Sequence, residues 1–79
     1  MPHKRLLDRI VLNPKVMTGK PVIKGTRLTV QFILGLLAGG ATVEDVLAEY
    51  KDLERADIKA CLLYASEMLE ETQIVPQRA

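Results

Sequence analysis

The stretch Thr18–Val30, "TGKPVIKGTRLTV", decides how the rest of the chain can fold. Its glycines and cations suggest a phosphate-binding loop, but their spacing does not fit one. Counted from Gly19, a Walker loop needs Gly-Lys-Ser/Thr after four intervening residues. Gly25 comes one residue too late and is followed by Thr26. The fingerprint G-x-G-x-x-G also fails, because position 21 holds Pro21. We therefore interpret the stretch as a turn, a short strand and the start of a helix.

Two extended segments surround the first loop. Arg9–Asn13 is apolar and β-branched up to Pro14, which predicts a strand. Val22–Ile23 follows a proline that cannot donate to a ladder, so this second strand lies at an edge or at a strand start. The sequence thus predicts a β-hairpin over residues 9–28. A two-stranded ribbon is marginal alone, so it must pack on helices or on another copy.

Three helices are expected in residues 29–69, because apolar residues recur there at helical spacing. Thr29 and Thr42 are the expected N-caps of the first two, the second in a capping box with Asp45. The predicted helices are Val30–Ala38, Val43–Tyr50 and Glu54–Leu69. The short link before the third helix is typical of a helix-turn-helix arrangement. The predicted fold class is therefore mainly α, a three-helix domain behind a short N-terminal β-hairpin.

The length of 79 residues predicts a single domain over 1–79, with a loose tail at 70–79. A core of this size is marginal, and one cysteine and one histidine offer neither a disulfide nor a zinc site. The helix Val30–Ala38 is apolar on all sides and is expected to be buried on all sides. A homo-oligomer, a dimer or higher, or a tightly bound partner would supply that cover. The expected interface residues are Ile10, Val22, Ile23, Phe32 and Leu36.

Charge is divided unevenly along the chain. Residues 1–27 hold seven basic groups and one acid, whereas residues 28–79 hold four basic groups and nine acids. The basic third would face double-stranded DNA, an acidic partner, or the acidic part of another copy. Candidate phosphate contacts are Lys4, Arg5, Arg9, Lys51, Arg55 and Lys59. Arg27 is open between two roles, a tether from hairpin to helix, which we favour, and a member of the basic face.

No set of residues in the sequence suits catalysis, a cofactor or a metal, so a non-enzymatic protein is expected. Cys61 is expected to be a small buried hydrophobe on the inner stripe of the third helix. That stripe is predicted as Ile58, Cys61, Leu62, Ala65 and Leu69, with Glu54, Arg55, Asp57 and Lys59 outside. The basic start leads to no long apolar run and no segment suits a bilayer, which predicts a cytoplasmic protein without membrane contact.

The sequence resembles the small bacterial "domain of unknown function" family numbered 433. The similar positions are Asn13-Pro14, Val16, Gly19, Pro21, Ile23, Gly25–Arg27 and Val30, followed by Glu44, Tyr50, Leu53 and Asp57-Ile58. Two positions depart from the family pattern, which usually has proline at Lys51 and a hydroxyl residue at Glu54. The second departure weakens the cap of the third helix and adds an acid where DNA would lie.

The resemblance implies a homeodomain-like or winged-helix-like fold behind a hairpin. Some members look like antitoxins of type II toxin–antitoxin pairs, encoded beside a PIN-like ribonuclease toxin. The resemblance therefore implies an antitoxin-like regulator that binds its toxin and represses its own promoter as a dimer. The alternative is a protein-interaction or dimerisation module that does not touch DNA.

Overall fold

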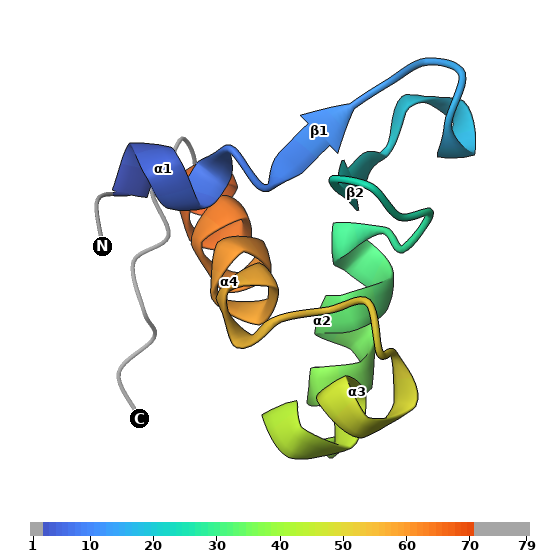
Figure 1. The fold of residues 1–79 in the computed structure, drawn as a ribbon. Helices are drawn as coiled ribbons and strands as arrows, with labels where there is room; N and C mark the ends of the chain where they lie inside the picture. Colours follow the sequence, from blue (N-terminus) through green and yellow to red (C-terminus); the bar gives the residue numbers. More distant parts are fainter. Residues whose placement is uncertain (1–2, 71–79) are drawn as a thin grey trace.

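The computed structural model describes residues 3–70, with side chains from residue 5 onward. The described part is mainly helical with a short two-stranded sheet (Figure 1), which confirms the predicted fold class. Its elements are α1 (His3–Leu7), β1 (Ile10–Leu12), the 3-10 turn η1 (Met17–Gly19), β2 (Pro21–Ile23), α2 (Val30–Ala38), α3 (Val43–Glu49) and α4 (Arg55–Glu70). The predicted loose tail begins too early, since Glu70 belongs to α4; the rest of it lies outside the described residues.

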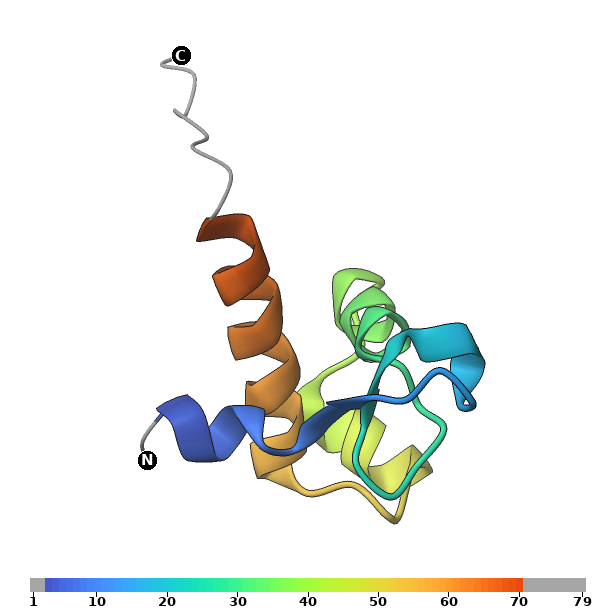
Figure 2. The same cartoon turned by 90° about the horizontal axis from the view of Figure 1, so that it is seen from above.

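Helix α1 was not predicted from the sequence. It is only five residues long, and its hydrophobic side chain Leu6 is 8% exposed. The helix packs against α4, which lies beside it in both views (Figures 1 and 2). A single turn with one buried leucine has almost no helical periodicity to detect.

The hairpin pairs β1 with β2 in antiparallel register, with Ile10 opposite Ile23 and Leu12 opposite Pro21. Beyond the strands, the Lys24 amide donates to the carbonyl oxygen of Arg9 at 2.8 Å. A further bridge joins Val22 to Thr29, so β2 lies between β1 and the start of α2. This central position buries Val22 and Ile23 of β2 within their own chain.

The connection between the strands contains an uncommon backbone conformation. Met17 and Thr18 have φ values of 50° and 54°, and Gly19 continues the left-handed stretch at 80°. Left-handed φ costs roughly 1–2 kcal/mol in a residue with a side chain. Amides on either side close the turn, with Val16 donating to Asn13 and Gly19 to Val16. The sequence predicts a left-handed conformation for Gly19 but not for Met17 or Thr18.

The predicted helix caps are confirmed. The Thr29 hydroxyl accepts from the Phe32 amide at 3.0 Å. Thr42 and Asp45 form the expected capping box, with bonds of 3.0 Å and 2.9 Å in opposite directions. These two caps fix where α2 and α3 begin. Helix α3 ends one residue earlier than predicted, because Tyr50 is its extended C-cap.

One aliphatic core joins the hairpin to the three later helices. Its buried members are Ile23, Val30, Ile33, Val46, Leu53, Ile58 and Cys61. Within the single chain α2 is not covered on all sides, since Phe32 is 42% exposed. The expected cover of this helix by a second copy or a partner stays a prediction. The Phe32 ring stands edge-on to Tyr50, with 5.7 Å between centroids. The other elements of the chain thus cover one side of α2 and leave Phe32 largely exposed on the far side.

The predicted inner stripe of α4 is correct only in its first half. Ile58 and Cys61 are buried, whereas Leu62 and Leu69 are 50% and 59% exposed. The later turns extend beyond the rest of the described molecule (Figure 2), so no element covers Leu69. Asp57 was expected outside and is only 6% exposed.

Candidate functional site

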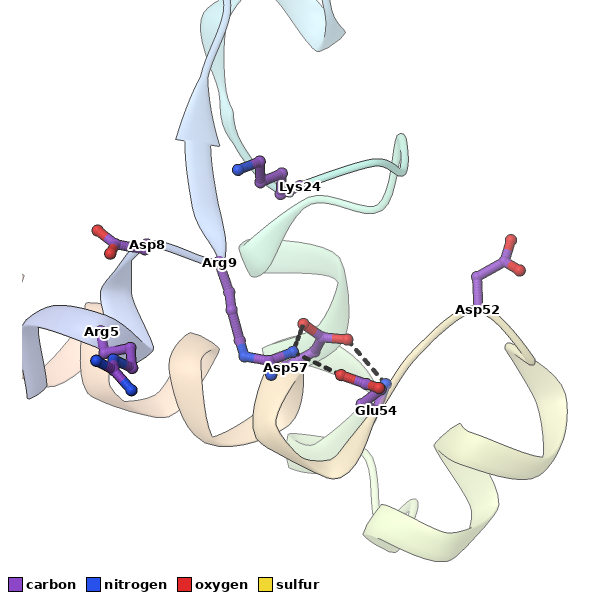
Figure 3. Close-up of a pocket in the computed structure, with 7 residues that line it drawn as sticks. All are labelled: Arg5, Asp8, Arg9, Lys24, Asp52, Glu54 and Asp57. Atoms are coloured by element: carbon purple, nitrogen blue, oxygen red, sulfur yellow. Dashed lines mark hydrogen bonds and ion pairs between the residues drawn. The ribbon is translucent and has the colours of Figure 1, made fainter. Parts of the chain in front are cut away.

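A charged groove lies where α1, the hairpin and the start of α4 meet (Figure 3). Its volume is about 460 Å³ and it opens widely to solvent. Seven charged residues line it: Arg5, Asp8, Arg9, Lys24, Asp52, Glu54 and Asp57. Cations and anions therefore meet here from segments that are far apart in the sequence.

Arg9 occupies the centre of this groove. Its Nη1 atom donates to Oε1 of Glu54 at 2.8 Å and to Oδ1 of Asp57 at 3.1 Å. The hydrogen bond to Glu54, and then that to Asp57, raises the pKa of Arg9 above its ordinary value. The Arg9 side chain is 32% exposed, whereas that of Asp57 is 8% exposed. The Asp57 carboxylate is therefore shielded from water more completely than the Arg9 guanidinium that it contacts.

Asp57 also caps α4. Its Oδ2 atom accepts from the Glu54 amide at 2.8 Å, just before the first turn of the helix. A carboxylate is favourable at this end of a helix, where backbone amides lack helical partners. Both oxygens of Asp57 are thus engaged, one by a helix amide and one by Arg9. We call Arg9, Glu54 and Asp57 the clasp, because they join the hairpin to α4.

A second, apolar groove lies between β2, α2 and the later turns of α4. Its volume is about 240 Å³. The apolar side chains that line it are Pro21, Val30, Leu34, Tyr64, Ala65 and Met68, with Lys20, Thr29 and Gln31 completing the lining. Met68, which lines this groove, is 58% exposed. Leu69, the next residue in the sequence, is also largely exposed, so the C-terminal end of α4 is mostly uncovered.

A family model described as "Protein of unknown function (DUF433)" matches residues 10–65. The chain belongs to the DUF433 family. A crystal structure of a DUF433 member from Anabaena variabilis is similar, with a TM-score of 0.76 and 28% sequence identity. The similarity covers 86% of this chain and 67% of that chain. No curated protein matches the sequence. The clasp falls within the DUF433 match, except for Arg9 immediately before it.

The candidate phosphate contacts of this DUF433 member differ in whether a carboxylate of the same chain already pairs with them. Arg9 belongs to the clasp and is paired with two carboxylates, so it is less available to phosphate than an unpaired cation; its role as a phosphate contact stays a prediction. Arg55 pairs with Glu44 of α3, and this hydrogen bond is the main cause that lowers the pKa of Glu44. The cations that remain exposed and make no ion pair to described residues are Arg5, Lys51 and Lys59. The side chain of Lys4 lies outside the described part.

The expected interface residues are also divided. Val22 and Ile23 are each 1% exposed, so the chain's own core already uses them and they offer no surface to another copy. Ile10 and Leu36 are half-buried and pack against that core. Phe32 is the member that remains largely exposed.

The tether between hairpin and helices was assigned to the wrong arginine. Arg27 is exposed and forms no ion pair with any residue from 3 to 70. Arg9 makes the tether instead, and Asp57 receives it. The sequence did contain a signal for Asp57. Glu54 directly precedes the helix, and an acid three residues later is the reciprocal half of a capping box.

Two negative findings apply to the described residues. Between residues 3 and 70, no three His, Cys, Asp or Glu side chains gather in a way that suits a metal ion. None of the helices there has the length and apolar character needed to cross a membrane.

Proposed function

We propose that this protein is a non-enzymatic binding module that holds a protein partner through the later turns of α4. The observation that carries the proposal is the apolar groove lined by Tyr64 and Met68, of which Met68 is 58% exposed. Apolar side chains that are more than half exposed and adjoin a groove are typical of protein interaction sites. Fold alone does not decide function, so the proposal rests on this site.

An antitoxin that holds a PIN-like ribonuclease is the particular form of this function that we favour, on the resemblance to antitoxin-like members of the family. Binding of promoter DNA by α4 receives less support. Arg55 is paired with Glu44, and Glu54 lies at the start of the same helix. Cations held by carboxylates add little attraction for phosphate.

The proposal is tested with the product of the neighbouring gene, co-expressed and purified with this chain. Met68→Asp places a charge in the apolar groove and should weaken the complex by about 30-fold or more, the size of an interface hot spot. Ser66→Asp is the matched control, since it adds the same charge at an exposed position outside the groove. Equal losses for both variants, or no complex at micromolar concentration, would contradict the proposal.

Self-association is a separate part of the proposal. Phe32 and Leu36 of α2 line a shallow hollow with Gly35, and Phe32 is the exposed aromatic there. We expect a dimer by light scattering at micromolar concentration, and Phe32→Asp should dissociate it because the charge would be desolvated without a partner. A monomeric wild-type protein under these conditions would contradict the proposed self-association. The proposal of partner binding in the apolar groove would be unaffected.

A further inference from the structure

We propose that the β-hairpin, rather than α4, is the surface through which this protein contacts the phosphate backbone of double-stranded DNA. Between Arg9 and Glu44 the sequence contains no Asp or Glu. The charged residues of this stretch are Lys15, Lys20, Lys24 and Arg27, and all four are exposed. Carboxylates of other segments lie near two of them, because Lys24 lines the charged groove and Arg27 lines a hollow with Glu49 and Asp52. The segment itself carries only positive charge, and such a segment attracts polyanions over a long range. Lys20 also lines the apolar groove proposed for the protein partner, so the two contacts adjoin at this side chain.

These cations differ from the arginines of the helical part in their availability. Arg9 and Arg55 lie in ion pairs with carboxylates. The four cations of the hairpin stretch form no ion pair to any residue in the described range 3–70. Phosphate binding therefore needs no internal pair to be broken first. It releases condensed counterions from the DNA, which is the main source of backbone affinity.

The hairpin geometry separates the cations into two pairs. Lys20 directly precedes β2 and Lys24 directly follows it. At about 3.3 Å per residue, their Cα atoms are about 13 Å apart. Each ammonium group stands on a flexible four-carbon stem, so the two lysines can reach separate phosphates of one duplex. Lys15 lies in the connection at the Lys20 end, and Arg27 in the turn beyond Lys24.

The position of the hairpin leaves it accessible to a duplex. In both views the connection that contains η1 lies at the edge of the molecule, on the side opposite α1 (Figures 1 and 2). Residues 10–29 contain no Phe, Tyr or Trp, so this surface offers no platform on which unpaired bases could stack. Contact with the regular backbone of a duplex fits such a surface better than single-strand binding.

The test uses the full chain and a fluorescent 24-base-pair duplex of mixed sequence. Anisotropy should show binding at 50 mM salt, with log affinity falling against log salt at a slope near roughly −3.6 for four contacts. Lys15→Glu with Arg27→Glu should weaken binding at least about tenfold and reduce the slope to roughly −1.8. The matched control, Arg5→Glu with Lys59→Glu, makes the same change of charge on α1 and α4 and should keep most of the affinity.

Lys15 and Arg27 are chosen because neither lines the apolar groove, and circular dichroism verifies that each variant is folded. Absence of binding at 50 mM salt would overturn the inference. So would an equal or larger loss in the control variant, which would return the contact to α1 and α4. Equally tight binding of a poly-glutamate chain would assign the surface to acidic proteins. Met68→Asp places an acid in the groove that Lys20 also lines, so it should weaken DNA binding by less than the Lys15→Glu and Arg27→Glu pair does. Loss of the protein complex without a comparable loss of DNA binding would therefore separate the two proposals.

Discussion

The Nη1 atom of Arg9 lies 3.1 Å from Oδ1 of Asp57, although the two residues are 48 positions apart in the chain. The contact joins the start of the hairpin to the first turn of α4. Because Asp57 is almost fully buried, its charge needs the two donors that it has, Arg9 and the Glu54 amide. Removal of one partner of such a buried charge is expected to destabilise the fold.

Arg9→Gln should lower the melting temperature, because the replacement retains a donor but loses the charge that faces Asp57. Lys24→Gln is the control: Lys24 lines the same groove but makes no ion pair with a described residue. Thermal unfolding followed by circular dichroism measures both. An effect of Lys24→Gln as large as that of Arg9→Gln would show that the clasp does not stabilise the fold specifically.

Two side chains of α4 should differ strongly in their contribution to stability. Ile58 is 1% exposed, so Ile58→Ala should cost about 2–5 kcal/mol in the free energy of unfolding. Leu62 is 50% exposed, so Leu62→Ala should change it by about 0.5 kcal/mol or less. Urea unfolding of both variants checks this. Similar losses would mean that Leu62 is covered, for instance in an oligomer, and a concentration series would reveal that case.

The capping box of α3 should give the protein a specific sensitivity to acid. The hydrogen bond from the Thr42 amide lowers the pKa of Asp45 below its ordinary value of 3.8. A lowered folded-state pKa means that the carboxylate stabilises the fold above the unfolded value and that this stability is lost as pH falls through the folded value. Asp45→Asn should therefore destabilise at pH 7, and its difference from the wild type should shrink between about pH 5 and pH 2.

The control for Asp45 is Glu49→Gln, at an exposed position of α3 outside the capping box. It removes the same charge without removing a cap. Urea midpoints measured at several pH values separate the two. A difference that stays constant with pH for Asp45→Asn would refute the role assigned to the ionised carboxylate.

Cys61 should be inert in the folded protein. Burial raises the pKa of its thiol to about 12, and the nearby Asp57 adds to the shift. Thiolate formation, and with it labelling by a disulfide reagent at pH 8, should therefore require opening of the core. A raised folded-state pKa gives stability that is complete below the unfolded value of about 8.5 and declines as pH rises above it. Cys61→Ala should flatten this alkaline decline, and labelling as fast as in urea would contradict the prediction.

Local signals in the sequence predicted much of this fold. The N-caps Thr29 and Thr42 are side chains that bond to amides three residues away, so short-range spacing is enough to find them. The hairpin was predicted from Pro21 and the β-branched runs for the same reason. Helix α1 was not predicted, because its burial depends on contact with α4. The five residues of α1 do not encode that contact.

The errors at the candidate site arise from contacts between distant segments. Asp57 has an exposed helical position by pattern, yet Arg9 from the hairpin covers it. Leu62 and Leu69 have inward positions by pattern, yet no element reaches them. Periodicity reports which residues share a face and gives no information on how far a covering element extends. Charge counts likewise located a basic region but did not separate paired from unpaired arginines.

The unequal cover of α4 gives this helix two ends with different dynamics. Ile58, Ala60 and Cys61 are at most 1% exposed near its start, whereas Met68 and Leu69 are mostly exposed near its end. Glu67 and Glu70 also place negative charge at the C-terminal end of the helix dipole, where it is unfavourable. Amide hydrogens of the last two turns should thus exchange through local fraying, far faster than those of the first two. A partner seated on Met68 would slow that exchange, and the entropy lost in ordering these turns would weaken its affinity.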